Sequence, residues 1–482
     1  MKQEAAISKS GGWFVECYNP INSHIQETIF MAQLRLHNHS NNIDMLHGPL
    51  LGKILLFALP LAASMMLQQL FNSADVAVVG RFDSPQAMAA VGSNGAAINL
   101  MVNLFVGLSI GANVIVARCI GRNETGKIHD AIHTSISLAL ISGVLLLIWG
   151  VLIAKPILTL MNTPEDIIDL AVVYFRIYFL GMPFIMLYNF GSAILRSKGD
   201  SKRPLWSLGL GGVINVILNL IFVIGLKLSV VGVALATVIS NVVSSIMIMY
   251  YLMTEDEPFR FKVGDLSFKR EHFIQILKIG LPAGIQGSLF SISNMTIQTA
   301  INSLGSYASA GSAAALNFDF LTYYVVAAFT QAAVTFTSQN FGAGDYGRCK
   351  RVFSLTMSTG LIFTGIVCLA CAVWKTGLLS LYTINPEVLR YAEVRMIHAV
   401  AFLWMTNIYE VSGGCLRGMG YSMLPSVLVL LGCCVLRIVW VYTVFAWDND
   451  FAVLMNVYPV SWTITGIATM IAYCYVRRKL FA

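Results

Sequence analysis

The sequence carries little charge for its length. Asp, Glu, Lys and Arg make up 11% of its 482 residues, whereas soluble domains carry roughly 25%. So few charges cannot cover the water-facing surface of a chain this long, which excludes an ordinary soluble protein. The 57% share of hydrophobic residues and the mean hydropathy of +0.72 are typical of membrane spans, each of which needs about 20 apolar residues as a helix.

Patterns that would indicate other protein classes are also missing. The nine Cys fall mostly in apolar runs, and the C-x-x-C at Cys368 and Cys371 has no nearby His, so we read these residues as packing residues. The strict alternation of a transmembrane barrel is absent, and runs such as 138–154 indicate helices. A G-x-S-x-G at 107–111 lies in an apolar span without a strand before it, and no nucleotide-binding or metalloprotease motif has a convincing setting. We therefore expect neither an enzyme nor an ATP-driven pump, and no cofactor.

The first 48 residues differ in composition from the rest of the chain. They are polar and charged, and contain no apolar stretch long enough for a signal peptide. We expect 1–48 to be a disordered cytoplasmic tail. The alternative is a start-site error, because Met45 directly precedes the first apolar segment.

The remainder of the chain is an internal repeat of two similar copies. Shifted by 221 or 222 residues, the second copy repeats the Gly, Pro and basic residues of the first. The matched pairs include Leu195-Arg196 with Leu416-Arg417, Gly121 with Gly342, Gly199 with Gly420, Pro204 with Pro425, and Leu59-Pro60 with Leu281-Pro282. We therefore predict two bundles, 49–254 and 272–482, joined by a polar cytoplasmic linker at 255–271.

Each copy contains six apolar segments, so the prediction is an all-α polytopic membrane protein of twelve transmembrane helices. Because six is even, both copies enter and leave on the same side, as a parallel repeat with a pseudo-twofold axis along the membrane normal and a V-shaped central cleft. The segments are roughly 53–80, 86–117, 130–154, 167–195, 204–226, 229–253, 272–304, 306–338, 350–374, 387–416, 423–447 and 452–476.

Basic residues gather in one set of loops. The opposite loops hold only Arg81, Lys155, Lys227 and Lys375, while Arg176, Arg390 and Arg395 fall in the outer parts of the fourth and tenth helices. By the positive-inside rule both termini are cytoplasmic, in a multi-pass protein of the cell membrane. The net charge of +7 reports this bias and not nucleic-acid binding.

Four polar residues of the first copy fall in one layer of the predicted bundle. Asp75 lies six residues before Arg81, about 9 Å from the outer edge at 1.5 Å per residue. Asn219 lies about 12 Å from that edge, with Asn215 one turn before it and Thr237 on the next helix. One carboxylate with amide and hydroxyl oxygens suits Na⁺, or a proton held on the carboxylate.

The second copy lacks this layer, because Ile297, Leu436 and Trp440 occupy the positions of Asp75, Asn215 and Asn219. A device needed only for folding would be expected in both copies. We therefore interpret the four residues as a cation-coupling site; the alternative is a structural acid whose Asn neighbours hold helices together.

The second copy has its own intramembrane charges. Asp319, Glu410 and Arg437 fall within about 5 Å of one another in depth. Since an unpaired buried charge is costly, we predict that Asp319 or Glu410 forms a hydrogen bond with Arg437. The cluster is either an ion pair that neutralises Arg437 or a cation-attracting wall of a substrate cavity.

At the level of motifs, the region 46–478 resembles the multidrug and toxic compound extrusion (MATE) family of secondary transporters. Each motif is weak alone, but their order and spacing in both copies are specific. They are Gly48-Pro49-Leu50, Phe57-Ala58-Leu59-Pro60, the run from Asn72 to Gly80, Ala193-Ile194-Leu195-Arg196 with Gly199-Asp200 and Pro204, the run from Asn340 to Asp345, and the run from Leu416 to Gly420.

The resemblance implies export of cationic drugs driven by Na⁺ or H⁺. The family's acid on the first helix corresponds to Asp75, and its other polar site residues to Asn215, Asn219 and Thr237. Some members carry Asp at the position of Asn219 and Glu at that of Phe290, and Glu410 lies one turn from their acid on the tenth helix. Asp75 is thus the one acid of the first-copy site.

Three other functions compete with export of organic cations by a monomer in the lipid bilayer. A flippase for lipid-linked precursors, from the same superfamily, would need a basic cavity, for which only Arg437 is available. A membrane-embedded enzyme would need a nucleophile and a base at midplane depth, and we find none. A channel needs no internal duplication.

Overall fold

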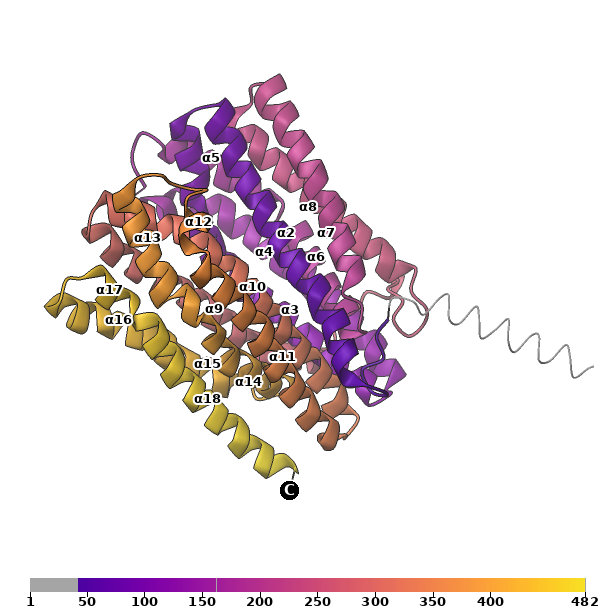
Figure 1. Ribbon diagram of the computed structural model, residues 1–482. Helices are drawn as coiled ribbons and strands as arrows, with labels where there is room; N and C mark the ends of the chain where they lie inside the picture. Colours follow the sequence, from indigo (N-terminus) through magenta and orange to yellow (C-terminus); the bar gives the residue numbers. More distant parts are fainter. Residues whose placement is uncertain (1–41, 162, 482) are drawn as a thin grey trace, which may run out of the picture. The chain divides into compact units, whose positions relative to one another are not determined.

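The computed structural model describes residues 42–161 and 163–481, and the regular secondary structure of this part of the chain is entirely helical. We call α2 to α8 the first half and α9 to α18 the second half (Figure 1). The elements are α2 Leu50–Phe82, α3 Pro85–Gly121, α4 Thr125–Leu160, α5 Ile168–Leu180, α6 Met182–Ser197, α7 Lys202–Asn219, η1 Leu220–Gly225, α8 Ser229–Met253, η2 Val263–Asp265, α9 Arg270–Ser303, α10 Ser306–Gly342, α11 Tyr346–Val373, α12 Lys375–Leu379, α13 Pro386–His398, η3 Val400–Met405, α14 Thr406–Gly418, α15 Met423–Val429, η4 Leu430–Val435, α16 Leu436–Trp440, η5 Val441–Phe445, α17 Phe451–Met455 and α18 Val457–Phe481.

All twelve predicted segments are helical. Among the described residues, 10 helices are long and apolar enough to cross a membrane, or 11 if α5 and α6 form one span. The predicted segment 387–416 is not a continuous helix. It is broken into α13, the 3-10 turn η3 and α14, and α13 carries Glu387, Arg390, Glu393 and Arg395. Because of these charges, α13 is less apolar than the other spans.

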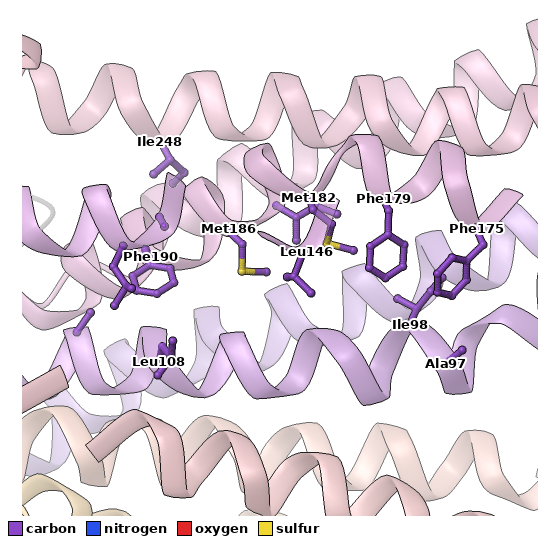
Figure 2. Packing of buried hydrophobic residues seen from close by; sticks show 14 of the residues in the cluster. Ala97, Ile98, Leu108, Leu146, Phe175, Phe179, Met182, Met186, Phe190 and Ile248 are labelled. Atoms are coloured by element: carbon purple, nitrogen blue, oxygen red, sulfur yellow. The ribbon is translucent and has the colours of Figure 1, made fainter. Parts of the chain in front are cut away.

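The matching segment of the first half is also broken. α5 and α6 meet at 49°, where Gly181 ends one helix and Pro183 lies in the first turn of the next. A Pro in the first turn needs no amide partner, so it starts a new helix without cost. The bend lets Phe175, Phe179, Met186 and Phe190 point from α5 and α6 into one apolar core with α3 and α4, as Figure 2 shows.

The two halves are in contact along α3 and α9 through glycines. A Cβ on Gly107 would lie 2.3 Å from the backbone nitrogen of Gly284, and one on Gly111 would lie 2.4 Å from the carbonyl oxygen of Ile276. A Cβ on Gly280 would lie 2.5 Å from Leu108 Cα. Small residues thus bring the two backbones together, as is common between helices in membranes.

The same two helix faces are uncovered farther along. Gly92 and Asn99 continue the α3 face toward Pro85 and are exposed, and Asn294 and Gln298 continue the α9 face toward Ser303 and are exposed. We call the end of the helices near Pro85 and Ser303 the far end, and the end near Gly121 and Arg270 the linker end. The halves therefore touch at the linker end and expose their facing surfaces at the far end.

Repeat-related contacts close the linker end. Arg118 on α3 donates two hydrogen bonds to the carbonyl oxygen of Gly418, at 3.2 and 2.9 Å. Gln339 on α10 occupies the matching position and donates to the carbonyl oxygen of Ser197 at 2.6 Å. Each half thus satisfies a free carbonyl at the C-terminal end of a helix in the other half.

The segment before α2 crosses this closed end. The amide of Ile43 donates to Gly199 in the first half, at 3.4 Å, and the Met45 carbonyl accepts from Asn340 and Arg348 in the second half, at 3.2 and 3.1 Å. The Met45 side chain is buried, unlike the polar tail predicted over 1–48. Residues 1–41 of that prediction lie outside the described residues.

The segment between α8 and α9 is held against the first half. Ser137 on α4 donates to the carbonyl oxygen of Ser267 at 3.0 Å, and Glu255 pairs with Lys198 and Arg203. Burial acts to raise the pKa of the Glu255 carboxyl, but the hydrogen bond and charge of Lys198 and the charge of Arg203 lower it below its usual value. Glu255 therefore stays ionised at neutral pH. The exact limits of the two bundles and of the linker remain predictions.

Candidate functional site

Three helices of the first half bring together the four residues predicted to form the coupling site. Asp75 comes from α2, Asn215 and Asn219 from α7, and Thr237 from α8. Asn219 Nδ2 donates to Asp75 Oδ1 at 2.5 Å, and Thr237 Oγ1 donates to Asp75 Oδ2 at 3.0 Å. Asn219 also donates to Asn215 Oδ1 at 3.2 Å. We call these four residues the Asp75 cluster.

The Asp75 cluster is buried but holds no basic residue. Asp75 is 5% exposed and Asn219 is fully buried, and no Lys, Arg or His among the described residues pairs with the carboxylate. A buried carboxylate without a counter-charge is unfavourable, so the site favours a bound cation or a proton. Asn219 Oδ1 has no hydrogen-bond partner within the described structure and is available as a further oxygen ligand.

Local helix geometry positions the amide. Asn219 is the last residue of α7, and the π-helical turn η1 begins at the next residue. Such turns interrupt α-helices and are frequent at functional sites. Tyr174 and Tyr178 of α5 stack on each other with ring centres 6.1 Å apart, and α5 packs against α8, the helix that carries Thr237. Sequence reasoning missed both tyrosines, since nothing but the packing of α5 distinguishes them from lipid-facing aromatic residues.

The corresponding positions of the second half form an apolar cluster. Ile297 is 1% exposed, and Leu436 and Trp440 pack against the same group of buried residues. Apolar side chains therefore replace the polar layer of the first half. The structure shows the same difference between the halves that the sequence indicated.

The predicted pairing of Arg437 in the second half is wrong. Asp319 on α10 instead binds Arg395 on α13, whose Nε and Nη2 donate to Asp319 Oδ2 at 2.9 and 2.5 Å. Glu410 on α14 accepts from the Tyr323 hydroxyl at 3.3 Å. Arg437 forms no ion pair within the described residues and donates to Ser461 and Asn294, at 3.2 and 3.3 Å. The break at η3 brings Arg395 inward, which counting residues along a straight helix could not predict.

The Asp319 and Arg395 pair provides a stability prediction. Replacing Arg395 by Met should lower the free energy of unfolding by about 3–5 kcal/mol, because the buried Asp319 charge loses its partner. Arg395 is 3% exposed. Thermal unfolding of the purified protein in detergent measures the effect.

Two controls belong to this experiment. Combining Arg395→Met with Asp319→Leu should recover much of the loss, since no uncompensated charge then remains. Lys375→Met, which breaks the half-exposed ion pair with Glu393, should cost about 0–1 kcal/mol. Equal losses for Arg395→Met and Lys375→Met would contradict the assignment.

Comparison with known proteins gives matches over most of the chain. The family model described as MatE matches twice, at residues 60–221 and 282–443. The probable multidrug resistance protein YoeA of Bacillus subtilis is 29% identical over 381 residues, which are 77% of this chain and 82% of that protein. The FAD transporter of Shewanella oneidensis is 24% identical over 353 residues, which are 72% of this chain and 78% of that protein.

Solved structures share the fold. A multidrug resistance MATE family transporter of the MOP superfamily, in an outward-facing conformation, is similar with a TM-score of 0.85 and 22% identity over 91% of this chain and 98% of that one. The two matches of the family model begin near Pro60 and Pro282, the repeat-related prolines of α2 and α9. The internal duplication read from the sequence thus corresponds to two copies of a known family unit.

Proposed function

Because this chain belongs to the MatE family of multidrug efflux transporters, we propose that it exports organic cations by alternating access, in exchange for an ion that binds at Asp75. It is a multi-pass membrane transporter and not an enzyme. The observation that carries the proposal is the Asp75 cluster, a buried acid held by neutral donors and without a counter-charge. Both termini face the cytoplasm in this proposal, so the linker end is the cytoplasmic end.

The geometry of the cluster bears on the identity of the ion. Each Asp75 oxygen accepts one hydrogen bond from a neutral donor, which leaves a second lone pair that can bind a proton while the donors stay in place. Na⁺ takes oxygen ligands, and Asn219 turns Nδ2 toward Asp75, so its unpartnered Oδ1 can share an ion with that carboxylate only after the amide turns. We therefore favour the proton, with Na⁺ as the alternative ion at the same residues.

The contacts between the halves support alternating access. The halves are joined at the linker end by the glycine faces of α3 and α9 and by Arg118 and Gln339, while the far-end surfaces are exposed. Release of substrate to the outside fits this arrangement. The opposite state requires the linker-end contacts to break, and the Asp75 cluster, confined to the first half, would bias that equilibrium when its ion binds.

Transport by the purified protein in lipid vesicles tests the proposal. A tenfold gradient of the coupling ion should drive about tenfold accumulation of an organic cation in one-for-one exchange, since each tenfold ion gradient supplies about 1.4 kcal/mol and the voltage terms cancel. A pH gradient and a Na⁺ gradient are imposed separately, each with the other ion equal on both sides. If neither gradient drives any of a panel of organic cations, the proposed function is wrong.

A further inference from the structure

Arg437 is a buried cation whose hydrogen bonds are incomplete. Its side chain is 1% exposed, and its Nε and Nη1 donate to the neutral oxygens of Ser461 and Asn294. Nη2 has no hydrogen-bond partner within the described structure. Leaving a buried guanidinium nitrogen without a partner costs free energy, so binding of a ligand that accepts a hydrogen bond from Nη2 is favoured.

Arg437 has no acid paired with it among the described residues. Two guanidinium groups lie over the Tyr458 ring, Arg437 at 4.7 Å and Arg395 at 5.5 Å from its centre. The buried acids of this half have other partners: Asp319 is bound by Arg395 through two nitrogens, and Glu410 accepts from a tyrosine hydroxyl. A buried guanidinium without an acid favours an added anion.

The helix that carries Arg437 is wound irregularly on both sides. α16 spans only Leu436–Trp440 between the π-helical turns η4 and η5. Ser293 on α9 donates to the carbonyl oxygen of Cys433 within η4, at 3.4 Å. These turns fix Arg437 against α9, and π-helical turns of this kind are often found at binding sites.

The site adjoins the surface that the first half leaves uncovered. Asn294 accepts from Arg437 Nη1 and is itself exposed. It lies on the same face of α9 as Gly280 and Gly287, about four and two turns farther from the linker end. Phe290, one turn before Asn294, is half-buried and lies 5.0 Å from the guanidinium. An anion at the exposed α9 face can therefore reach Arg437 by displacing the Asn294 side chain.

We propose that Arg437, through Nη2 and through Nη1 once Asn294 moves aside, binds the carboxylate of those transported organic compounds that carry one beside their amine. A guanidinium presents parallel N–H groups that match a carboxylate, and the rings of Phe290 and Tyr458 suit an organic body more than a hydrated inorganic ion. This proposal rests on the proposed export function and assigns a carboxylate subsite within it. A free inorganic anion such as chloride is the other source of negative charge.

Transport of a matched pair of compounds tests the proposal. The probes are a fluorescent aromatic amino acid derivative and its methyl ester, which keeps the amine and removes the carboxylate charge. In vesicles containing the wild-type protein, both should be driven by the ion gradient. Arg437→Gln should reduce transport of the acid at least tenfold and that of the ester less than twofold. Arg390→Gln, which changes an exposed arginine of α13, should leave both rates unchanged.

A second variant tests the same site in case Arg437→Gln does not fold. Asn294→Asp changes an exposed side chain by one atom and places a carboxylate beside Arg437. This internal acid should occupy the site, and should lower transport of the acid about tenfold while the ester is transported normally. Thermal unfolding of each variant shows that it is folded.

The outcomes separate this proposal from the function on which it rests. The carboxylate site is wrong if the wild-type protein transports the ester under an ion gradient but each variant lowers transport of acid and ester by the same factor. It is also wrong if neither variant lowers transport of either compound. If raising chloride stabilises the wild type against heat, leaves Arg437→Gln unchanged and abolishes the difference between acid and ester, the anion is inorganic and the proposal is overturned. Failure of the ester itself, and of other organic cations, under every gradient would refute the export function.

Discussion

We expect the Asp75→Asn variant to lose ion-driven export while remaining folded. The amide is nearly isosteric with the carboxylate, and its oxygen can still accept a hydrogen bond from Asn219 or Thr237. It cannot bind a proton near neutral pH, and it brings no charge to hold Na⁺. Accumulation of an organic cation in vesicles under an imposed pH or Na⁺ gradient measures the loss.

The expected size follows from the ion gradient. Moving one charge through 100 mV supplies about 2.3 kcal/mol, and a tenfold ion gradient about 1.4 kcal/mol. Together they support roughly a 500-fold gradient of a neutral solute, or about tenfold for a cation exchanged one for one. The variant should lower the accumulation ratio of the organic cation from about ten to about one, because without a bound ion no coupling remains.

Controls separate a coupling role from a structural one. Asp83→Asn, at an exposed acid just beyond α2, should leave accumulation unchanged. Binding of the organic cation to detergent-solubilised Asp75→Asn should persist, as should its thermal unfolding temperature within a few degrees. If Asp75→Asn accumulates substrate at the normal rate, the carboxylate is a structural acid and the proposed coupling site is wrong.

The second large effect is expected at the contact between the halves. Gly107→Ala should disfavour the conformation described here and abolish transport, because the new methyl group would lie 2.3 Å from the backbone of Gly284. Backbone cannot move aside as the end of a side chain can, so the helices must separate. Overpacking costs about 1–3 kcal/mol, occasionally more. An energy of 2 kcal/mol changes the balance between the two states about 30-fold.

Disulfide cross-linking of the two helices measures this shift. Replacing Asn103 and Gly287 by Cys gives a suitable pair, since a Cβ on Gly287 would lie 3.4 Å from Asn103 Cβ, close to the usual spacing in a disulfide. Cross-linking should be fast in the parent and at least tenfold slower with Gly107→Ala. Gly92→Ala is the matched control, because Gly92 lies on the same helix with no atom within 4 Å of an added Cβ. Equal cross-linking rates in all three proteins would contradict the close packing of α3 on α9.

The sequence alone determined the class of the protein, its duplication and the composition of the Asp75 cluster. Apolar runs are forced into helices in a membrane because every backbone polar group must find a partner within the segment. A regular helix rises 1.5 Å per residue, so the depth of a polar side chain can be counted from the end of its span. That count placed Asp75, Asn219 and Thr237 in one layer, and the three residues do meet, although the count for Asn219 crosses the π-helical turn η1.

Only the tertiary structure decided which charges pair and how the halves meet. Arg395 reaches Asp319, and Arg437 does not, because the break at η3 and the π-helical turns beside α16 change the direction in which a side chain points. Depth along a helix follows from residue number, but direction around it depends on irregular turns and on the neighbouring helix. The close approach of Gly107 to Gly284 has the same origin: glycines occur throughout the spans, and packing of one helix on another selects those that form the contact.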